Sequence, residues 1–303
     1  MEVLPKKILS VIHPKKFNLD NSGAYHLAIN TGPELIKICC IEHLTKECLW
    51  LSVYKLPLAK QQPDYIKCLE QLYNEDFFLI KKDWRSVTLS ISNQKCTLVP
   101  HLLLSTKDLA TYLHVACGVD PSDTVVCFTH ALAKVSLVFS ETTAVVDWFR
   151  KRYTSSNFHL IHQANALIEG FQLECPMPSK PTWLVWLDHH YVHIVVRHKT
   201  QLLYYNSFVY ETAHDFLSCL SAVRHVLKLK YNDCIVWVGG LIEKNSVAYR
   251  GLKTCMPRMS LKNTLHFMHP RMRVFQKMQC APMVYFDLMS SFLCHPHVPY
   301  SKH

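Results

Sequence analysis

Glycine is scarce in this chain of 303 residues. It occurs 7 times, where average usage of about 7% would give roughly 21. The shortage excludes collagen-like and linker-rich architectures. It also leaves few positions for glycine-rich loops that hold nucleotide phosphates, because such loops need main-chain N–H groups with no Cβ in the way. Any chemistry of that kind must be confined to very few places.

Long apolar segments and metal-type cysteine pairs are also missing. No run approaches 18 uninterrupted apolar residues, so we expect no membrane-spanning helix, and residues 1–10 lack the apolar core of a secretory signal. The chain has 13 cysteines, but none stands in the C-x-x-C spacing of zinc sites. We therefore interpret them as reduced side chains of a cytoplasmic protein, most of them buried, with no membrane association and no metal centre.

Acidic residues are scarce in one half of the chain. Residues 1–176 hold 18 basic and 17 acidic residues, whereas residues 177–303 hold 15 and 6. The stretch 244–286 has eight basic residues and no acidic one, with Tyr249, Phe267 and Phe275 interleaved. It is interpreted as a solvated face, or as a docking surface for an acidic partner or a nucleic acid. The candidate partner-binding residues are Lys253, Arg258, Lys262 and Arg271.

The hydrophobic periodicity alternates between strands and helices, which indicates an α/β fold. Strands of the first half are expected within 24–42, 48–58, 86–92, 125–128, 135–139 and 158–162. Those of the second half are expected at 183–187, 191–197, 201–210 and 234–238. Two capping-box sequences, Ser105–Asp108 and Thr212–Asp215, predict the starts of two helices.

A proline-rich segment divides the chain. Cys175–Pro181 contains three prolines, which can neither continue a helix nor donate to a sheet. We therefore predict an N-terminal lobe over 1–176 and a C-terminal lobe over 177–303. Both run as three strands, a helix, a strand and more helix, which suggests an internal duplication. In each half the first two strands meet at a tight turn, formed by Asn30–Gly32 and by Asp188–His190.

This layout resembles the actin-like ATPase superfamily of actin, Hsp70 chaperones and sugar kinases. The resemblance implies two ribonuclease-H-like lobes in an actin-like arrangement, with ATP and magnesium between them. In that superfamily each first turn carries D-x-G, and a later glycine pair faces the adenosine. The matching positions here, and the candidate cofactor-binding residues, are Asn30, Thr31, Gly32, Asp188, Gly239 and Gly240.

Each turn departs from the superfamily pattern. The first keeps Gly32 but has Asn30 in place of the aspartate, and a neutral amide supplies neither charge nor basicity. The second keeps Asp188 but has His190 in place of the glycine. Gly239–Gly240 is intact, although a strand end that needs positive φ explains it equally well. We therefore predict no catalytic residue and no bound cofactor, with ATP and magnesium left as an alternative.

Four further stretches show a closer resemblance: Tyr25–Leu27, Asn93–Pro100, Leu203–Phe208 with Asp215–Phe216, and Gly240–Ser246. In these stretches the chain resembles a bacterial family of unknown function, domain-of-unknown-function family 3822, which has this actin-like architecture. The resemblance implies the fold but no activity. Within these stretches, Asn93, Asn206 and Ser207 are interpreted as turn or cap residues, and Asp215 as the acid of the capping box.

Three functions remain open from the sequence. The leading hypothesis is a cytoplasmic, non-catalytic actin-like protein that binds a protein partner and has a degenerate nucleotide cleft. The first alternative is an ATP-binding switch or weak ATPase that uses Gly239–Gly240 and Asp188. The second is a nucleic-acid-binding protein that uses the basic stretch. A histidine metal site is not expected, because on a strand His189 and His193 would lie about 13 Å apart. The tail, residues 295–303, is predicted to be disordered.

Overall fold

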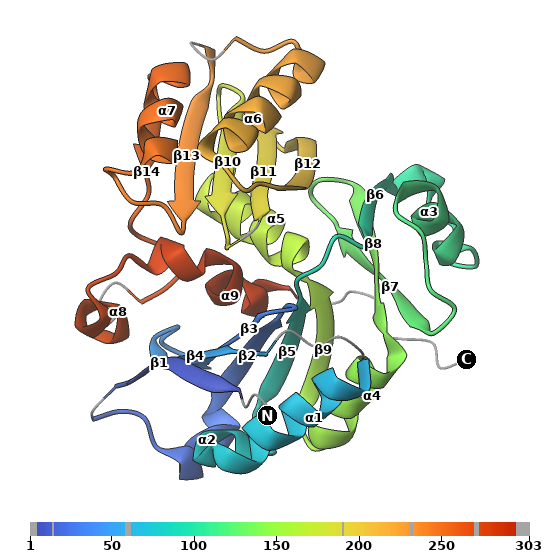
Figure 1. Ribbon diagram of the computed structural model, residues 1–303, viewed down its shortest axis with the longest axis vertical. Coiled ribbons are helices and arrows are strands. Elements are labelled where there is room, and N and C mark those ends of the chain that lie inside the picture. Colours follow the sequence, from blue (N-terminus) through green and yellow to red (C-terminus); the bar gives the residue numbers. More distant parts are fainter. Residues whose placement is uncertain are drawn as a thin grey trace.

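The computed structural model describes residues 5–13, 15–57, 62–189, 191–230, 233–269 and 273–294. It confirms the α/β class, with two large sheets at opposite ends of the molecule, helices between and outside them, and a small third sheet at one side (Figure 1). The predicted tail, His190 and Arg271 lie outside the described residues. Among the described residues, no helix combines the length and apolarity needed to cross a membrane.

The first large sheet has six strands in the order β1-β4-β3-β2-β5-β9. β2, β3 and β4 form an antiparallel meander, and β5 and β9 run parallel to β2. Its outer face packs on α1 and α4 through one apolar core that includes Leu27, Leu69 and Phe149. The bounds are β1 Lys6–Ile12, β2 Tyr25–Thr31, β3 Leu35–Glu42, β4 Cys48–Lys55, β5 Ser86–Ile91, β9 Asn157–His162, α1 Gln62–Glu75, α2 Phe77–Ile80 and α4 Thr143–Arg152.

The second large sheet has five strands in the order β12-β11-β10-β13-β14. Successive side chains of a strand point to opposite faces. Trp183 and Val185 accordingly pack on the outer helices α6 and α7, whereas Leu184 and Trp186 face the interior of the molecule. The bounds are β10 Thr182–Leu187, β11 Tyr191–His198, β12 Gln201–Val209, β13 Ile235–Gly240, β14 Met259–Leu261, α6 Ala213–Leu227 and α7 Val247–Cys255.

The two sheets repeat one topology. β4-β3-β2-β5-β9 and β12-β11-β10-β13-β14 each consist of three antiparallel strands followed by two parallel ones. This agreement confirms the duplicated layout expected from the sequence. The boundary between residues 176 and 177 stays a prediction.

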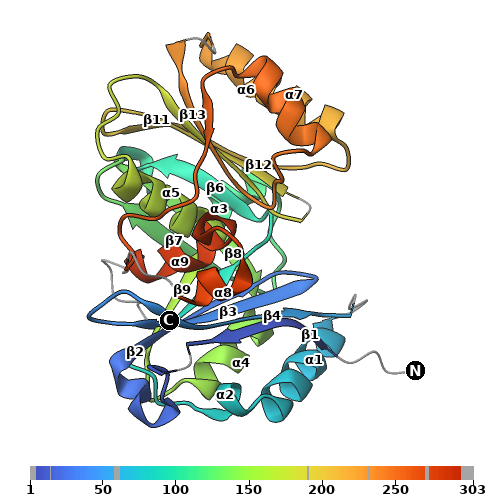
Figure 2. The same ribbon diagram turned by 90° about the vertical axis from the view of Figure 1, so that its left-hand side faces the viewer.

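A layer of helices separates the two sheets (Figure 2). It consists of α5 (Gln163–Glu174), α8 (Arg273–Met278) and α9 (Phe286–Ser290). These helices join the inner faces of both sheets in one core, which includes Leu51, Phe171, Trp186 and Met289. α8 and α9 come from the end of the chain, yet they pack on β4, β2 and β3 of the first sheet.

A third sheet is inserted between β5 and α4. Its strands β6 (Cys96–Pro100), β7 (Asp123–His130) and β8 (Val135–Thr142) pair in the order β6-β8-β7, and α3 (Leu109–Ala116) packs on it. The sequence predicted two of these strands but not that they form a separate sheet. The short 3₁₀ helices are η1 Leu19–Ala24, η2 His101–Leu103, η4 Pro282–Tyr285 and η5 Ser291–Leu293.

One of the two predicted capping boxes forms. Thr212 Oγ1 accepts from the Asp215 N–H at 3.2 Å, and Asp215 Oδ2 accepts from the Thr212 N–H at 3.0 Å, so α6 begins as expected. The box at Ser105 was wrong. The Ser105 N–H instead donates to the Tyr112 hydroxyl at 2.9 Å, and α3 begins after Asp108.

Candidate functional site

The first of the two matched turns uses its polar groups internally. Asn30, at the end of β2, is buried and donates from Nδ2 to Ser90 Oγ at 3.3 Å. The Thr31 hydroxyl contacts the Tyr65 hydroxyl, which also donates to the Gly32 carbonyl oxygen at 3.4 Å. Asn30 is therefore bonded within the sheet, and Thr31 and the Gly32 carbonyl hold α1 against it.

The second turn places Asp188, just after β10, beside a lysine from the other sheet. Lys37 of β3 has its Nζ 3.2 Å from Asp188 Oδ2 and 2.7 Å from Asp287 Oδ2 on α9. Gln163, the first residue of α5, donates from Nε2 to the same two oxygens at 3.1 and 2.8 Å. Ser92 Oγ in turn donates to Gln163 Oε1 at 2.8 Å. We call Lys37, Gln163, Asp188 and Asp287 the lysine–carboxylate cluster.

The lysine–carboxylate cluster is almost completely withdrawn from solvent. The exposed fractions of the side chains are 7% for Lys37, 13% for Asp188 and 0% for Asp287. Burial alone would lower the pKa of Lys37, but Asp188 and Asp287 raise it well above its ordinary value. Burial likewise opposes ionisation of Asp188, yet Lys37 and Gln163 bring the pKa of that carboxyl well below its usual range. The ammonium and the Asp188 carboxylate are thus both charged at neutral pH.

Sequence reasoning found Asp188 but missed its three partners. Lys37 is the one charged residue among the six buried residues of β3, and that was a usable signal, because a lysine is rarely buried without a partner. Gln163 and Asp287 carried no comparable signal, since they lie far from Lys37 in the sequence and their meeting depends on the packing of α5 and α9.

The space beside the lysine–carboxylate cluster is small. The cavity lined by residues of both turns has a volume of about 40 Å³. Its lining residues are Asn30, Gly32, Pro33, Glu34, Leu35, Lys37, Ser92, Asp188, His189 and Tyr191. Ligand pockets for small molecules typically measure about 300 to 1,000 Å³. This cavity can hold a water molecule but not the phosphates of a nucleotide.

The glycine pair at the end of β13 is required by internal packing. A Cβ on Gly239 would lie 2.5 Å from Met283 Cγ, so the side chain of Met283 fills the place where a ligand would approach. Gly240 has φ +85° and a virtual Cβ 2.0 Å from the Leu187 carbonyl oxygen. The positive φ was one of the two interpretations that the sequence left open. The residues present at both turns and at the glycine pair do not fit bound ATP and magnesium.

The basic stretch is divided between surface and core. Lys253 and Arg258 are exposed, near the end of α7. Lys262 is half-buried, with its Nζ 4.0 Å from the centre of the Trp237 ring. Phe275 is buried, and Phe267 packs on Phe286 and Phe292. The two phenylalanines interleaved with the basic residues are therefore turned inward, where they cannot stack on bases.

Two interpretations of polar residues in the family-like stretches have different outcomes. Asn93 makes turn contacts as expected, because its Oδ1 accepts from the Lys95 N–H at 2.8 Å. Asn206 and Ser207 were wrongly placed at a turn or cap: they lie within β12, which continues to Val209. The reason is that Tyr205 and Phe208 pack partly on the cores and hold the strand together.

Comparison with solved structures shows the class of fold. The fold is similar to a crystal structure from Bacteroides thetaiotaomicron, described as a protein with actin-like ATPase fold and unknown function. The TM-score is 0.77 and the identity 15%, over 92% of this chain and 99% of that one. It is also similar to a chain of the PilM–PilN type IV pilus biogenesis complex, with a TM-score of 0.62 and 12% identity, over 89% and 99%. The expected α/β actin-like fold is thereby confirmed.

The family follows from the sequence itself. A model of the family described as protein of unknown function (DUF3822) matches residues 14–258. The chain belongs to this family, as the resemblance had implied. None of the curated proteins compared with the chain matches it.

Proposed function

We propose that this protein is a non-catalytic member of the actin-like fold class that acts in the cytoplasm by binding a protein partner. One observation carries the proposal: the Lys37 ammonium lies between the Asp188 and Asp287 carboxylates, at 3.2 and 2.7 Å. A positive charge of the protein's own thus takes the oxygens that a magnesium ion would need. The 13 cysteines, all free in the structure, fit a reducing compartment.

Displacing Lys37 with a magnesium ion would be costly. The ammonium would have to remain buried without its partners, and an uncompensated buried charge costs several kcal/mol. The room for phosphates is missing as well, since the cavity lined by both turns has a volume of about 40 Å³ and Met283 packs against Gly239. If the protein binds no nucleotide, it acts by binding a partner through its surface.

The experiment is a thermal unfolding series with ATP and Mg²⁺ at millimolar concentrations. A ligand at 100 times its Kd stabilises a protein by about 2.7 kcal/mol, so a bound nucleotide would raise Tm by several degrees. We expect no change in Tm and no magnesium-dependent phosphate release. A rise in Tm that is lost in Asp188→Asn, while the circular dichroism of the variant stays unchanged, would contradict the proposal and establish the nucleotide switch.

The partner is proposed to be acidic where it meets Lys253 and Arg258, both exposed on a strongly basic half of the chain. The fold is compatible with such a role, since PilM, which shares it, was solved in a complex with PilN. Nucleic-acid binding is the less favoured reading, because Phe267 and Phe275 are turned inward. RNA or DNA affinity that falls steeply with salt, and falls further in Lys253→Ala/Arg258→Ala, would favour it instead.

A further inference from the structure

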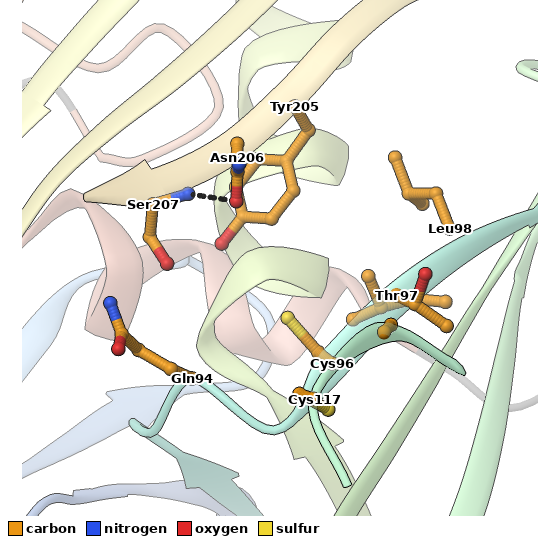
Figure 3. Close-up of a pocket in the computed structure, with 10 residues that line it drawn as sticks. Gln94, Cys96, Thr97, Leu98, Cys117, Tyr205, Asn206 and Ser207 are labelled. Carbon is orange, nitrogen blue, oxygen red and sulfur yellow. Dashed lines mark hydrogen bonds between the residues drawn. The ribbon is translucent and has the colours of Figure 1, made fainter. Parts of the chain in front are cut away.

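A groove of about 540 Å³ lies between the inserted sheet and the second large sheet (Figure 3). One wall is β6 with the loop before it, and the other is β12, which lies beside it in both views of the whole molecule. The lining residues are Gln94, Cys96, Thr97, Leu98, Ala116, Cys117, Leu137, Tyr205, Asn206 and Ser207. Two stretches that carry the family resemblance, Asn93–Pro100 and Leu203–Phe208, thus meet at one site.

Both walls are edge strands. β6 ends the order β6-β8-β7, and β12 ends the order β12-β11-β10-β13-β14. An edge strand has one row of main-chain N–H and C=O groups that its own sheet does not use. β12 is the longer edge, with nine residues, whereas β6 has five and ends at Pro100, which cannot donate.

The free row of β12 includes the main-chain groups of Ser207. The Ser207 N–H donates to Asn206 Oδ1 at 2.9 Å, a side chain of its own strand (Figure 3), and so points away from β11. Along a strand, the main-chain N–H and C=O groups of successive residues point alternately to its two sides. The N–H and C=O of Tyr205, two residues before Ser207, therefore also point away from β11. The Asn206 amide covers the Ser207 N–H and is itself exposed, so it can be displaced by an incoming acceptor.

The lining of the groove has no charged side chain. Gln94, Thr97, Asn206 and Ser207 are neutral and can both donate and accept hydrogen bonds. Cys96 and Leu98 form an apolar base that continues into the main core. A phosphate or a carboxylate would find no counter-charge here. A main chain, which carries neutral donors and acceptors in alternation, matches both the lining and the free edge.

We propose that this groove binds an extended peptide segment of the partner protein, added as a strand to the free edge of β12. One uncharged side chain of the segment lies against Cys96 and Leu98, and Gln94 and Thr97 form the facing wall. The proposal rests on the partner-binding function above, since it names the place and form of that binding. Addition of a strand supplies affinity through main-chain hydrogen bonds and specificity through the side-chain pocket.

The test starts with the full-length protein and a display library of random twelve-residue peptides. An enriched peptide is labelled, and its Kd is measured by fluorescence anisotropy. In Ser207→Pro the N–H that points away from β11 is removed and the edge is blocked, while the bonds to β11 are kept, so we expect Kd to rise at least tenfold. Ser207→Ala keeps the N–H and serves as the matched control, with Kd within about twofold of the original.

A second variant keeps the test valid if Ser207→Pro does not fold. Thr97→Arg places a charge on the opposite, half-buried wall, and we expect at least a tenfold loss there too. Hydrogen exchange at residues 205–209 should slow when peptide is bound. Failure to enrich any peptide, or enriched peptides whose Kd is unchanged in both variants, overturns the proposal.

The outcomes separate this proposal from the proposed function. If no peptide is enriched, or if Kd is unchanged in both variants, and ATP does not raise Tm, the groove proposal alone is overturned and partner binding is left to other surfaces. A rise in Tm with ATP overturns the non-catalytic role, whatever the peptide result. A dimer in analytical ultracentrifugation that Ser207→Pro converts to monomer would show that a second copy occupies the edge, and it would overturn the peptide proposal.

Discussion

Lys37 is the residue on which the closed cleft depends. Its ammonium makes two ion pairs in a site where all three charged side chains, its own included, are nearly or fully buried. Removing one partner from a buried ion pair typically costs 3–5 kcal/mol, because the remaining charge is left uncompensated. The side chain also lies over Trp186, with its Nζ 5.3 Å from the ring centre. Lys37 is thus held by two carboxylates and an indole ring.

We expect Lys37→Met to lower the free energy of unfolding by about 3–5 kcal/mol, since it leaves Asp188 and Asp287 facing each other without a cation. Urea unfolding followed by circular dichroism measures the change. Lys253→Met, on the exposed surface of α7, is the control and should change stability by less than about 0.5 kcal/mol. Equal stabilities of the two variants would show that the ion pairs contribute nothing net.

Gly239 gives a second test at the residue scale. Gly239→Ala would bring a Cβ to 2.5 Å from Met283 Cγ, and such overpacking costs about 1–3 kcal/mol. The matched control is Gly239→Ala combined with Met283→Ala, which removes the clashing atoms. Met283→Ala alone costs about 2–5 kcal/mol, so we expect thermal unfolding to show that the double variant loses less stability than the sum of the two single-variant losses. Additive losses would mean that Gly239 is required for another reason.

At the scale of elements, α5 is attached through a histidine cap. His162 Nδ1 accepts from the Ala164 N–H at 3.1 Å, and its Nε2 donates to the Asn93 carbonyl oxygen at 3.0 Å. Because an N–H only donates and a carbonyl only accepts, this arrangement requires the neutral imidazole protonated at Nε2. Burial lowers the pKa of His162 to about 4. Protonation of Nδ1 would break the cap of the helix that carries Gln163.

The pH dependence follows from that cap. The pKa is about 6.5 in the unfolded chain and about 4 in the folded one. The contribution to stability is therefore complete above pH 6.5 and is lost as pH falls toward 4, on the order of 3 kcal/mol in total. His162→Asn keeps a capping side chain but cannot titrate. We expect its stability, measured by urea unfolding, to fall less between pH 7 and pH 4.5 than that of the original protein. Parallel curves would contradict this role.

At the scale of the whole molecule, the two halves share one inner core. α5 of the first half packs on α9 of the second, so closely that a Cβ on Gly170 would lie 2.1 Å from Ser290 Oγ. The inner residues Leu167 and Phe171 of α5 are buried among side chains of the second half. Separation of the halves would expose this apolar layer.

We therefore expect a fragment of residues 1–176 to lack cooperative unfolding and to aggregate, because its inner sheet face and α5 would be uncovered. Near-ultraviolet circular dichroism and size-exclusion chromatography measure this. Mixing with a fragment of residues 177–303 should recover a soluble complex. A monomeric 1–176 fragment with the near-ultraviolet spectrum of a packed core would contradict the expectation.

Local pattern predicted most strands of the two large sheets, because their burial repeats along the chain, but it missed β1, β6 and β14. Cys39 and Cys40 are an example. They are adjacent on β3, so the alternation of a strand places them in the cores on opposite faces of the sheet. The closed cleft could not be predicted in the same way. Lys37 meets Asp287 across 250 positions of sequence, and no periodicity encodes such a meeting. The same holds for the groove, whose walls β6 and β12 belong to different sheets.

Residues 286–294 pack on the first sheet although they are far from it in the sequence, and this also affects how the molecule folds. Cys294 completes the core of the first sheet, and Asp287 pairs with a residue 250 positions earlier. Contacts between such distant positions slow folding, since a very long loop must close before they form. During synthesis the first sheet keeps an apolar face uncovered until residues 286–294 have left the ribosome. The two lobes therefore reach their native packing together, and a chaperone that shields that face would raise the yield of folded protein.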